Sequence, residues 1–244
     1  MRKILFFIAI AAVLLFVFGW LLHAISYLLA PTSANEITEL EAEDIIELPE
    51  PRRRSDVSVE EAIYSRRSTR SYADRPLTLP ETAQVLWAAV GRTVNGVTGA
   101  TRAYPSAGGI YPLTVYLVAG EVEGLEPGVY RYDWQRHGLQ PVAGGDRRAA
   151  LARAALGQGA IQRAPASLVF TGDFARTRRR YGSRGEERYV PMDMGGAGQN
   201  VHLQAEALEL ATVVIGAFND SGVREVIAGA EGEPLYIMPL GGKP

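Results

Sequence analysis

The sequence contains no cysteine. Disulfides, thiolate nucleophiles, iron–sulfur clusters and zinc sites built on cysteine are therefore excluded. Histidine is also scarce, because only His23, His137 and His202 occur and they lie far apart along the chain. Transition metals are commonly held by clusters of histidine and cysteine, so we expect no metal site. For His137 and His202 we expect structural or solvated roles.

Charge is almost absent from the first thirty residues, which carry Arg2 and Lys3 and then no formally charged residue until Glu36. An apolar run of about 20 residues crosses a bilayer as a helix, whereas the core of a signal peptide has about 7–15. The sequence therefore predicts a retained single-pass membrane anchor over residues 1–30. The alternative is a signal that is cleaved near the small residues of "TSAN". Because basic residues precede the span, the positive-inside rule predicts a cytoplasmic N-terminus and an extracytoplasmic domain.

Residues 31–57 are rich in acidic residues and run into the segment "PEPRRRSD". Prolines and charges of this kind are typical of a spacer that has no hydrophobic core of its own. We therefore expect one folded domain over residues 58–244. Acidic and basic side chains nearly balance in that part of the chain, so nothing there indicates a nucleic-acid partner.

Helices and strands are predicted to intermix in this domain without regular alternation. Ser58 followed by Glu61 forms a capping box, and Pro80 and Gly91 mark the two ends of the next helix. This order is typical of an α+β domain with a mainly antiparallel sheet. We predict helices that begin at residues 58 and 220, and further helices over 79–91, 146–157 and 199–210. We predict strands over 113–120, 166–174, 212–218 and 234–241, and a hairpin over 128–142.

The segment "SRRSTRSY" at residues 65–72 gathers arginines and hydroxyl groups. Guanidinium groups bind phosphate in bidentate fashion, and a hydroxyl adds a further donor. Arg66, Arg67, Ser68 and Arg70 are therefore candidates for a phosphate site, to which Lys243 near the C-terminus would add one charge. The alternatives are a solvated surface loop and a frayed tail.

Two glycine-rich segments are further candidates for a binding site. In "YPSAGGIYP", the run from Pro105 to Gly108 is stiff at its start and free of side chains at its end, so a flat ligand can approach the backbone, although an ordinary turn fits as well. Ser106 lacks the surroundings of a hydrolase nucleophile. In "DMGGAGQNV", the third glycine of a dinucleotide fingerprint would fall on Val201, so we expect no Rossmann site.

Taken together, these segments resemble one family. The motifs "SRRSTRSY", "PSAGGIYPL", "GVYRYD", "RYGSRGEERYVPMDMGGAGQNVHLQAEALEL" and "LYIMPLGGKP" follow one another over residues 58–244. In this order they are similar to the nitroreductase superfamily, and within it to the SagB/ThcOx-type flavin oxidoreductases. The resemblance implies an α+β homodimer that binds FMN at the interface between its subunits.

The resemblance also implies roles for individual residues. Arg66, Arg67, Ser68 and Arg70 would hold the phosphate and ribityl chain of FMN, with Lys243 also near the phosphate. Pro105, Ser106, Ala107 and Gly108 would line the flavin ring. Gln199 and Asn200 would lie at the start of a buried helix near the flavin, and Gly216 and Ala217 would direct a backbone N–H toward flavin N5. Arg188 and Tyr189 would occupy the positions of a catalytic pair.

At two positions the chain departs from its relatives. Relatives that oxidise azoline rings carry a Lys-Tyr pair where this chain has Arg188 and Tyr189, and Gly196 replaces a histidine found in many others. Arginine effectively cannot lose a proton, so Arg188 is a poor general base, and an ion pair with a packed tyrosine ring is the alternative for this pair.

The function that we expect is an FMN-dependent oxidoreductase that transfers two electrons through flavin N5. NAD(P)H is the usual electron donor in the superfamily, although an extracytoplasmic domain would not meet it readily. The alternatives are a dehydrogenase of azoline-type heterocycles in a modified peptide, and a flavin-holding or scaffold protein without turnover.

Overall fold

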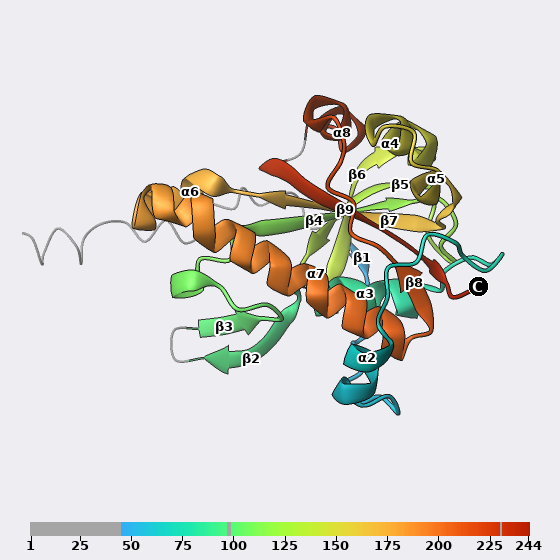
Figure 1. Ribbon diagram of the computed structural model, residues 1–244, viewed down its shortest axis with the longest axis horizontal. Coiled ribbons are helices and arrows are strands. Elements are labelled where there is room, and N and C mark those ends of the chain that lie inside the picture. Colours follow the sequence, from blue (N-terminus) through green and yellow to red (C-terminus); the bar gives the residue numbers. More distant parts are fainter. Residues whose placement is uncertain (1–44, 97–98, 230) are drawn as a thin grey trace, which may run out of the picture. The chain divides into compact units, whose positions relative to one another are not determined.

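The computed structural model describes residues 45–96, 99–229 and 231–244, and a sheet of seven strands forms their centre (Figure 1). The strand order is β1-β6-β5-β4-β7-β9-β8, and every neighbouring pair is antiparallel. The predicted α+β class with a mainly antiparallel sheet is confirmed. The strands of this sheet are β1 (Ile46–Glu47), β4 (Leu113–Ala119), β5 (Gly128–Asp133), β6 (Gly138–Gly144), β7 (Ala166–Gly172), β8 (Leu210–Thr212) and β9 (Glu233–Gly242).

Helices cover both faces of the sheet. On one face lie α3 and α7, and on the other lie α4, α5 and α8, as Figure 1 and the two hydrophobic clusters show. The helices are α2 (Val59–Ser65), α3 (Leu79–Val90), α4 (Arg148–Ala154), α5 (Gly159–Arg163), α6 (Phe174–Tyr181), α7 (Val190–Ala207) and α8 (Asp220–Val226), with a π-helical turn over Gly185–Tyr189 before α7.

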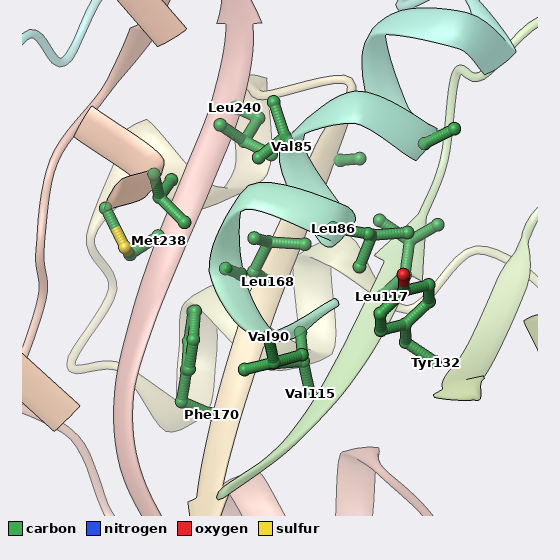
Figure 2. Packing of buried hydrophobic residues seen from close by; sticks show 14 of the residues in the cluster. Val85, Leu86, Val90, Val115, Leu117, Tyr132, Leu168, Phe170, Met238 and Leu240 are labelled. Atoms are coloured by element: carbon green, nitrogen blue, oxygen red, sulfur yellow. The ribbon is translucent and has the colours of Figure 1, made fainter. Parts of the chain in front are cut away.

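The two cores follow from the alternation of side chains along the central strands. In β4, Val115 and Leu117 enter the cluster under α3 and α7, while Tyr116 and Val118 enter the cluster under the other helices. Both faces of the strand are thus apolar. Figure 2 shows the first core, in which Leu86 and other residues of α3 pack onto side chains of β4, β7 and β9.

Helix α3 forms where its sequence predicts it. Thr78 and Glu81 make a reciprocal capping box, Pro80 lies in the first turn, and Gly91 caps the end of the helix. The box satisfies backbone donors that the first turn would otherwise leave without partners. The helix is therefore fixed at both ends before the chain enters an antiparallel hairpin of β2 (Arg92–Gly96) and β3 (Gly99–Arg102), which the sequence did not predict.

Helix α7 begins at Val190, nine residues earlier than predicted. The prediction rested on apolar positions between 201 and 210 and did not extend into the glycine-rich segment, where each glycine weakens a helix by about 1 kcal/mol. Packing of α7 against β9 explains why the helix includes the glycine-rich segment. A Cβ at Gly198 would lie only 3.1 Å from the hydroxyl oxygen of Tyr236, and this hydroxyl donates a hydrogen bond of 2.8 Å to the carbonyl oxygen of Met194. Glycine therefore allows the helix to lie close to β9.

The predicted spacer is wrong for its described part, residues 45–57. Ile46 and Glu47 pair with β6, and Leu48 enters the core with 8% of its surface exposed. Gln84 of α3 also exchanges two hydrogen bonds with the backbone of Arg52, at 2.7 and 3.0 Å. The isoleucines and Leu48 between the acidic residues supply enough apolar surface to join the domain, which therefore begins before residue 58.

Other predictions concern parts of the chain that are irregular or not described. The strand predicted over 212–218 ends at Thr212, and beyond it only Ile215 forms an isolated bridge, to Ile237. The predicted anchor over residues 1–30 and residues 31–44 of the predicted spacer lie outside the described residues. Within the described ranges, none of the helices combines the length and the apolar character that a membrane crossing requires.

Candidate functional site

Helix α7 connects the predicted site residues, which gather at two places along it. Near its start, Asp193 faces the loop that contains Pro105 to Gly108. Near its end, His202 and Glu206 face the basic segment after α2 and the C-terminal residues. Asp193 and His202 are nine residues apart, which is about 14 Å along a helix. The predicted residues therefore form two groups within one chain.

The loop group is held by a buried carboxylate that the sequence did not single out. The hydroxyl of Ser106 donates to Asp193 Oδ2 at 2.5 Å and accepts from the backbone N–H of Tyr111 at 2.9 Å. Burial raises the pKa of Asp193, and the hydrogen bonds from Ser106 and the backbone of Ala107 oppose this rise. Ser106 thus has a positioning role, as its lack of a hydrolase motif suggested.

Gly108 lies at the most constrained position of this loop. Its φ of 61° is in the left-handed region that glycine adopts at low cost, and a Cβ there would overlap the hydroxyl of Tyr181. The carbonyl oxygen of Gly108 accepts a hydrogen bond of 3.1 Å from Arg180 Nη1. Pro105 and Gly108 are exposed and Ser106 and Ala107 are half-buried. The loop therefore presents backbone and small side chains at the surface, where a flat ligand could lie. We call this loop, from Pro105 to Gly108, the shelf.

The predicted catalytic pair lies beside this loop. The ring of Tyr189 packs edge-on against the ring of Tyr181, with centroids 4.9 Å apart, and Tyr181 in turn contacts the Gly108 position. Arg188 is exposed. Both residues belong to the π-helical turn before α7, and such turns often occur at functional sites. Neither Tyr181 nor the π-helical turn was predicted from the sequence.

The basic segment lies at the other group, beside β8. The backbone N–H of Thr69 donates to the carbonyl oxygen of Thr212 at 2.9 Å. Arg66 is half-buried, whereas Arg67, Ser68 and Arg70 are exposed. A further arginine, Arg163 of α5, donates to the carbonyl oxygen of Arg70 at 3.4 Å. Because α5 is distant in the sequence, only the tertiary structure could reveal this fourth arginine.

The arginines of this group are not neutralised by the protein. Among the described residues, none of Arg66, Arg67, Arg70 and Arg163 forms an ion pair with a carboxylate. The phenol of Tyr72 lies next to them; burial raises its pKa, while Arg163 and then Arg70 lower it. Such a concentration of free guanidinium groups fits a ligand that carries a phosphate.

Lys243 reaches this region but has a partner in the protein. Its Nζ lies 2.5 Å from Glu206 Oε2, and its backbone N–H donates to the carbonyl oxygen of Glu209 at 2.9 Å. The tail is therefore ordered by α7 and not frayed. His202, one turn before Glu206, is buried; burial and then Arg66 lower its pKa, whereas Glu206 raises it.

The remaining predicted residues are Gln199, Asn200, Gly216 and Ala217. Gln199 and Asn200 are in the middle of α7 and not at its start. Gln199 is exposed, while the side-chain amide of Asn200 donates to the carbonyl oxygen of Ala103 at 2.8 Å and so ties α7 to the chain that enters the loop. Gly216 and Ala217 are exposed in the irregular segment after β8, where a Cβ on Gly216 would meet nothing within 4 Å.

One buried arginine supports the loop from below. Arg102, with 7% of its surface exposed, donates to the carbonyl oxygens of Val90 at 2.7 Å and Leu113 at 3.2 Å. Its guanidinium carbon lies 5.0 Å from the ring centre of Trp134 and 5.3 Å from that of Tyr104. Burial lowers its pKa. Arg102 thus joins the end of α3, the start of β4 and the aromatic rings under the loop.

The two described histidines have structural surroundings. The two ring nitrogens of His137 lie 2.7 Å from the hydroxyl of Tyr132 and 2.9 Å from the carbonyl oxygen of Pro49. His202 is enclosed by α7 and its neighbours. Among the described residues, no group of three or more histidine, aspartate and glutamate side chains is arranged to hold a metal ion.

Residues 63–242 match the Nitroreductase family. The chain belongs to this family. A relative from Methanocaldococcus jannaschii that is named as a nitroreductase is 41% identical over 188 residues, which are 77% of this chain and 92% of the relative. The protein is therefore an oxidoreductase of the nitroreductase family.

Solved structures share this nitroreductase fold. A crystal structure from Ralstonia eutropha, also named as a nitroreductase, is 30% identical with a TM-score of 0.69 and covers 83% of this chain and 90% of its own. A microcin synthetase complex from Escherichia coli, solved with a truncated pro-microcin bound, contains a chain that is 23% identical with a TM-score of 0.61. That match covers 87% of this chain and 84% of the other.

Proposed function

We propose that the protein is an FMN-dependent oxidoreductase of the SagB/ThcOx type. The observation that carries this proposal is the group of arginines around Arg66, Arg70 and Arg163, which lacks carboxylate partners among the described residues. A phosphate group carries about two negative charges near neutral pH and accepts several hydrogen bonds. A phosphate-bearing cofactor would supply the charge that the protein does not.

The residues present fit this cofactor at both of its ends. Arg66, Arg67, Ser68 and Arg70 would hold the phosphate and ribityl chain, with Arg163 beside them and Lys243 at the edge of the group. The run from Pro105 to Gly108 would line the ring, because it presents backbone and small side chains and is held by Asp193 and Arg180. Gly216 and Ala217, which are both exposed, would direct a backbone N–H toward flavin N5.

When bound, FMN supplies two-electron transfer through its ring, and the protein supplies position and environment. Tyr189 carries a phenol that can donate or accept a hydrogen bond near the shelf. Arg188 can orient an anionic group there but cannot act as a base, because arginine keeps its proton. We therefore assign proton handling at this position to Tyr189 and charge stabilisation to Arg188.

We further propose that the protein works as a homodimer. The apolar residues Val59, Ile63 and Tyr64 of α2 are exposed by 65%, 57% and 93%, and Met192 of α7 by 68%. A groove of about 880 Å³ lies between α2, α3 and α7. Exposed apolar side chains of this kind are typical of an interface. In this proposal the Pro105–Gly108 loop of one subunit completes a site with the arginines of the other, so that the two-fold symmetric dimer has two equal sites.

A second candidate is a dehydrogenase that acts on heterocycles in a modified peptide. It is favoured by the position of Tyr189 and by the similarity to a chain of the microcin synthetase complex. Arg188 argues against it, since a lysine at this position can lose a proton and arginine cannot.

The membrane anchor predicted over residues 1–30 remains part of the FMN oxidoreductase proposal, as a prediction about where the protein is located. NADH or NADPH is the electron donor that we would test first.

The test of the FMN proposal is the flavin content of purified full-length protein. We expect Arg66→Ala combined with Arg70→Ala to fold and to lose most of its FMN, because two charge-assisted contacts to the phosphate are removed. Arg136→Ala combined with Arg153→Ala is the matched control, since these exposed arginines lie outside both the arginine group and the groove between α2, α3 and α7. Equal absorbance of flavin in both double variants would contradict the proposal.

Turnover separates an enzyme from a flavin-holding protein. NADH or NADPH added without oxygen should bleach the flavin absorbance of the wild-type protein. Bound flavin that neither these donors nor an uncharged dihydronicotinamide reduces would favour the scaffold alternative. Release of an oxidised heterocycle from a peptide precursor would instead favour the second candidate.

A further inference from the structure

The segment from α6 to the π-helical turn carries an unusual concentration of positive charge. Residues 176–188 contain six arginines and two carboxylates, Glu186 and Glu187. All six arginines are exposed. Within the described residues, the one ion pair that they form joins Arg178 to Glu186 at 3.4 Å. Like charges gathered on one surface repel each other. The fold therefore gains no stability from this cluster, which indicates a role in binding.

Four of these arginines form a surface that faces away from the core. Thr177 is buried with 2% of its surface exposed and marks the inner side of α6. Arg179, two residues later, is turned by about 200° from it and so points outward. The turn packs against α6. We call this surface the α6 patch; its members are Arg176, Arg178, Arg179 and Arg184. Arg180 and Arg188 are not included, because we assign them to the shelf and to the catalytic pair.

The α6 patch is separate from the surfaces that the cofactor and the dimer would use. Figure 1 shows α6 and β8 at opposite ends of the described domain. The arginines around Arg66 lie beside β8, where the backbone N–H of Thr69 donates to Thr212. None of the patch residues lines the groove between α2, α3 and α7. The patch is therefore available to a further partner.

A membrane surface that contains anionic lipids fits this patch. Proteins hold peptides mainly in grooves and along strand edges, whereas the patch is the outer face of a short helix. An anionic membrane attracts exposed basic residues without a groove. Guanidinium groups also bind the phosphate oxygens of lipid headgroups in bidentate fashion. Charge and shape together thus favour a lipid surface over an acidic peptide.

The sequence before the domain gives an independent argument for the same partner. The charge-poor residues 1–30 predict a membrane anchor. The 14 residues from 31 to 44 then join the anchor to the described domain, and a chain of this length can span at most about 50 Å. A short tether of this kind gives the domain a high effective concentration at the membrane, so that weak contacts form.

We propose that the α6 patch docks the folded domain onto a membrane surface that contains anionic lipids. The arginines bind the headgroup phosphates, and α6 lies against the bilayer. Because Arg180 of the same helix donates to the carbonyl oxygen of Gly108, docking brings the shelf close to the lipid surface. This inference goes beyond the proposed function and needs no flavin chemistry.

The first experiment uses the chain from residue 45 to 244, loaded with excess FMN. This part contains all seven strands of the sheet and both hydrophobic clusters, and it lies within one compact unit. Without the predicted anchor, membrane binding has to come from the surface of the domain. The excess FMN is added to occupy the arginines around Arg66, so that they do not bind lipid.

Binding is measured by co-sedimentation with vesicles made of equal parts of phosphatidylglycerol and phosphatidylcholine, or of phosphatidylcholine alone. The wild-type chain should bind only the anionic vesicles, and salt should weaken binding because it screens charge. Each basic residue near an anionic surface strengthens binding about fivefold, so Arg179→Gln combined with Arg184→Gln should bind about 25-fold more weakly. Arg136→Gln combined with Arg153→Gln removes the same charge at exposed positions outside the patch and should bind like the wild type.

Three results would overturn the inference. Equal losses in the two double variants would mean that net charge governs binding and the patch does not. Equal binding by the wild type and the patch variant, with unchanged flavin content and thermal midpoint, would mean that the patch does not contact lipid. Binding of polyglutamate without binding of anionic vesicles would mean that the partner is an acidic protein.

Full-length protein in lipid nanodiscs tests docking with the anchor segment present. Hydrogen exchange of residues 174–184 should be slower on nanodiscs that contain phosphatidylglycerol than on those of phosphatidylcholine alone, and Arg179→Gln/Arg184→Gln should abolish this difference. Equal exchange of the wild type on both kinds of nanodisc would contradict docking. Flavin content and flavin reduction are measured separately, so failure of the oxidoreductase proposal would leave the comparison of the vesicle-binding variants intact.

Discussion

Asp193 shows how a single residue couples the loop to α7. The hydrogen bond from Ser106 holds this carboxylate in a buried position, and burial raises its pKa. A raised pKa means that the folded protein favours the protonated acid. The stabilising contribution of protonation is complete below the unfolded value of about 4. It is lost as the pH rises through the higher pKa of the folded state.

Asp193→Asn should therefore change how stability depends on pH. The amide stays neutral and can still accept the hydrogen bond from Ser106. We expect the free energy of unfolding of the wild-type protein to fall relative to that of the variant as the pH rises above about 4. Urea unfolding of both proteins at several pH values measures this difference. A difference that is constant with pH, or that grows in favour of the wild type, would contradict the assignment.

Gly108 offers a prediction with an internal control in the next residue. Gly108 and Gly109 have φ values of 61° and 66°, but a Cβ would overlap Tyr181 at position 108 and lie 3.9 Å from Tyr111 at position 109. Alanine at either position pays about 1 kcal/mol for the left-handed backbone. Gly108→Ala should cost about 1–3 kcal/mol more because of the overlap. Thermal unfolding compares the two variants, and equal losses would mean that Tyr181 yields without cost.

At the scale of elements, Arg102 joins parts of the chain that the sequence treats as separate. Arg102 lies at the end of β3, and its side chain donates hydrogen bonds to carbonyl oxygens at the end of α3 and the start of β4. The rings of Tyr104 and Trp134 lie next to its guanidinium group. A buried arginine without a carboxylate is stable only if carbonyl oxygens and ring faces replace water around it. The side chain of Arg102 thus anchors the hairpin of β2 and β3 to the core.

Arg102→Lys keeps the charge and removes the planar fork. A lysine ammonium is a compact donor that cannot span the same carbonyl oxygens, so we expect a loss of about 2 kcal/mol in the free energy of unfolding. Arg92→Lys is the control, because Arg92 pairs with Arg102 across the hairpin but is exposed. It should cost less than about 0.5 kcal/mol. Similar losses in the two variants in urea would show that Arg102 is not the anchor.

At the scale of the whole molecule, the folded unit includes residues before 58. Strand β1 extends the sheet through β6, Leu48 enters the core, and its backbone N–H donates to the carbonyl oxygen of His137 at 3.2 Å. The side chain of His137 then holds the carbonyl oxygen of Pro49. This segment covers an edge of the sheet that would otherwise expose unpaired backbone groups.

A chain that begins at residue 58 should therefore be less stable than one that begins at residue 45. Burial of Leu48 contributes about 1.5–3 kcal/mol and each hydrogen bond about 1 kcal/mol, so we expect a loss of about 3 kcal/mol or more. Urea unfolding of both chains measures the difference. Equal midpoints and equal slopes would mean that the segment adds nothing to the fold.

Local patterns in the sequence determined a large part of this protein. The capping residues of α2 and α3, the β-branched runs of β4 and β7 and the hairpin of β5 and β6 depend on neighbours within a few residues, and the structure places them where they were predicted. The α+β class follows from their order. The similarity of the motifs also indicated the family, because those motifs are short and occur in a fixed order.

Tertiary structure decided what depends on partners far away in the sequence. Glycines weaken an isolated helix, yet the close approach of Tyr236 to Gly198 extends α7 back to Val190. Asp193, Arg163 and Tyr181 are ordinary in sequence and acquire their roles only from Ser106, Arg70 and Gly108, which lie on other elements. Long-range packing can outweigh local propensity because burying apolar surface and satisfying buried polar groups involve larger free energies than the choice of backbone conformation at one residue.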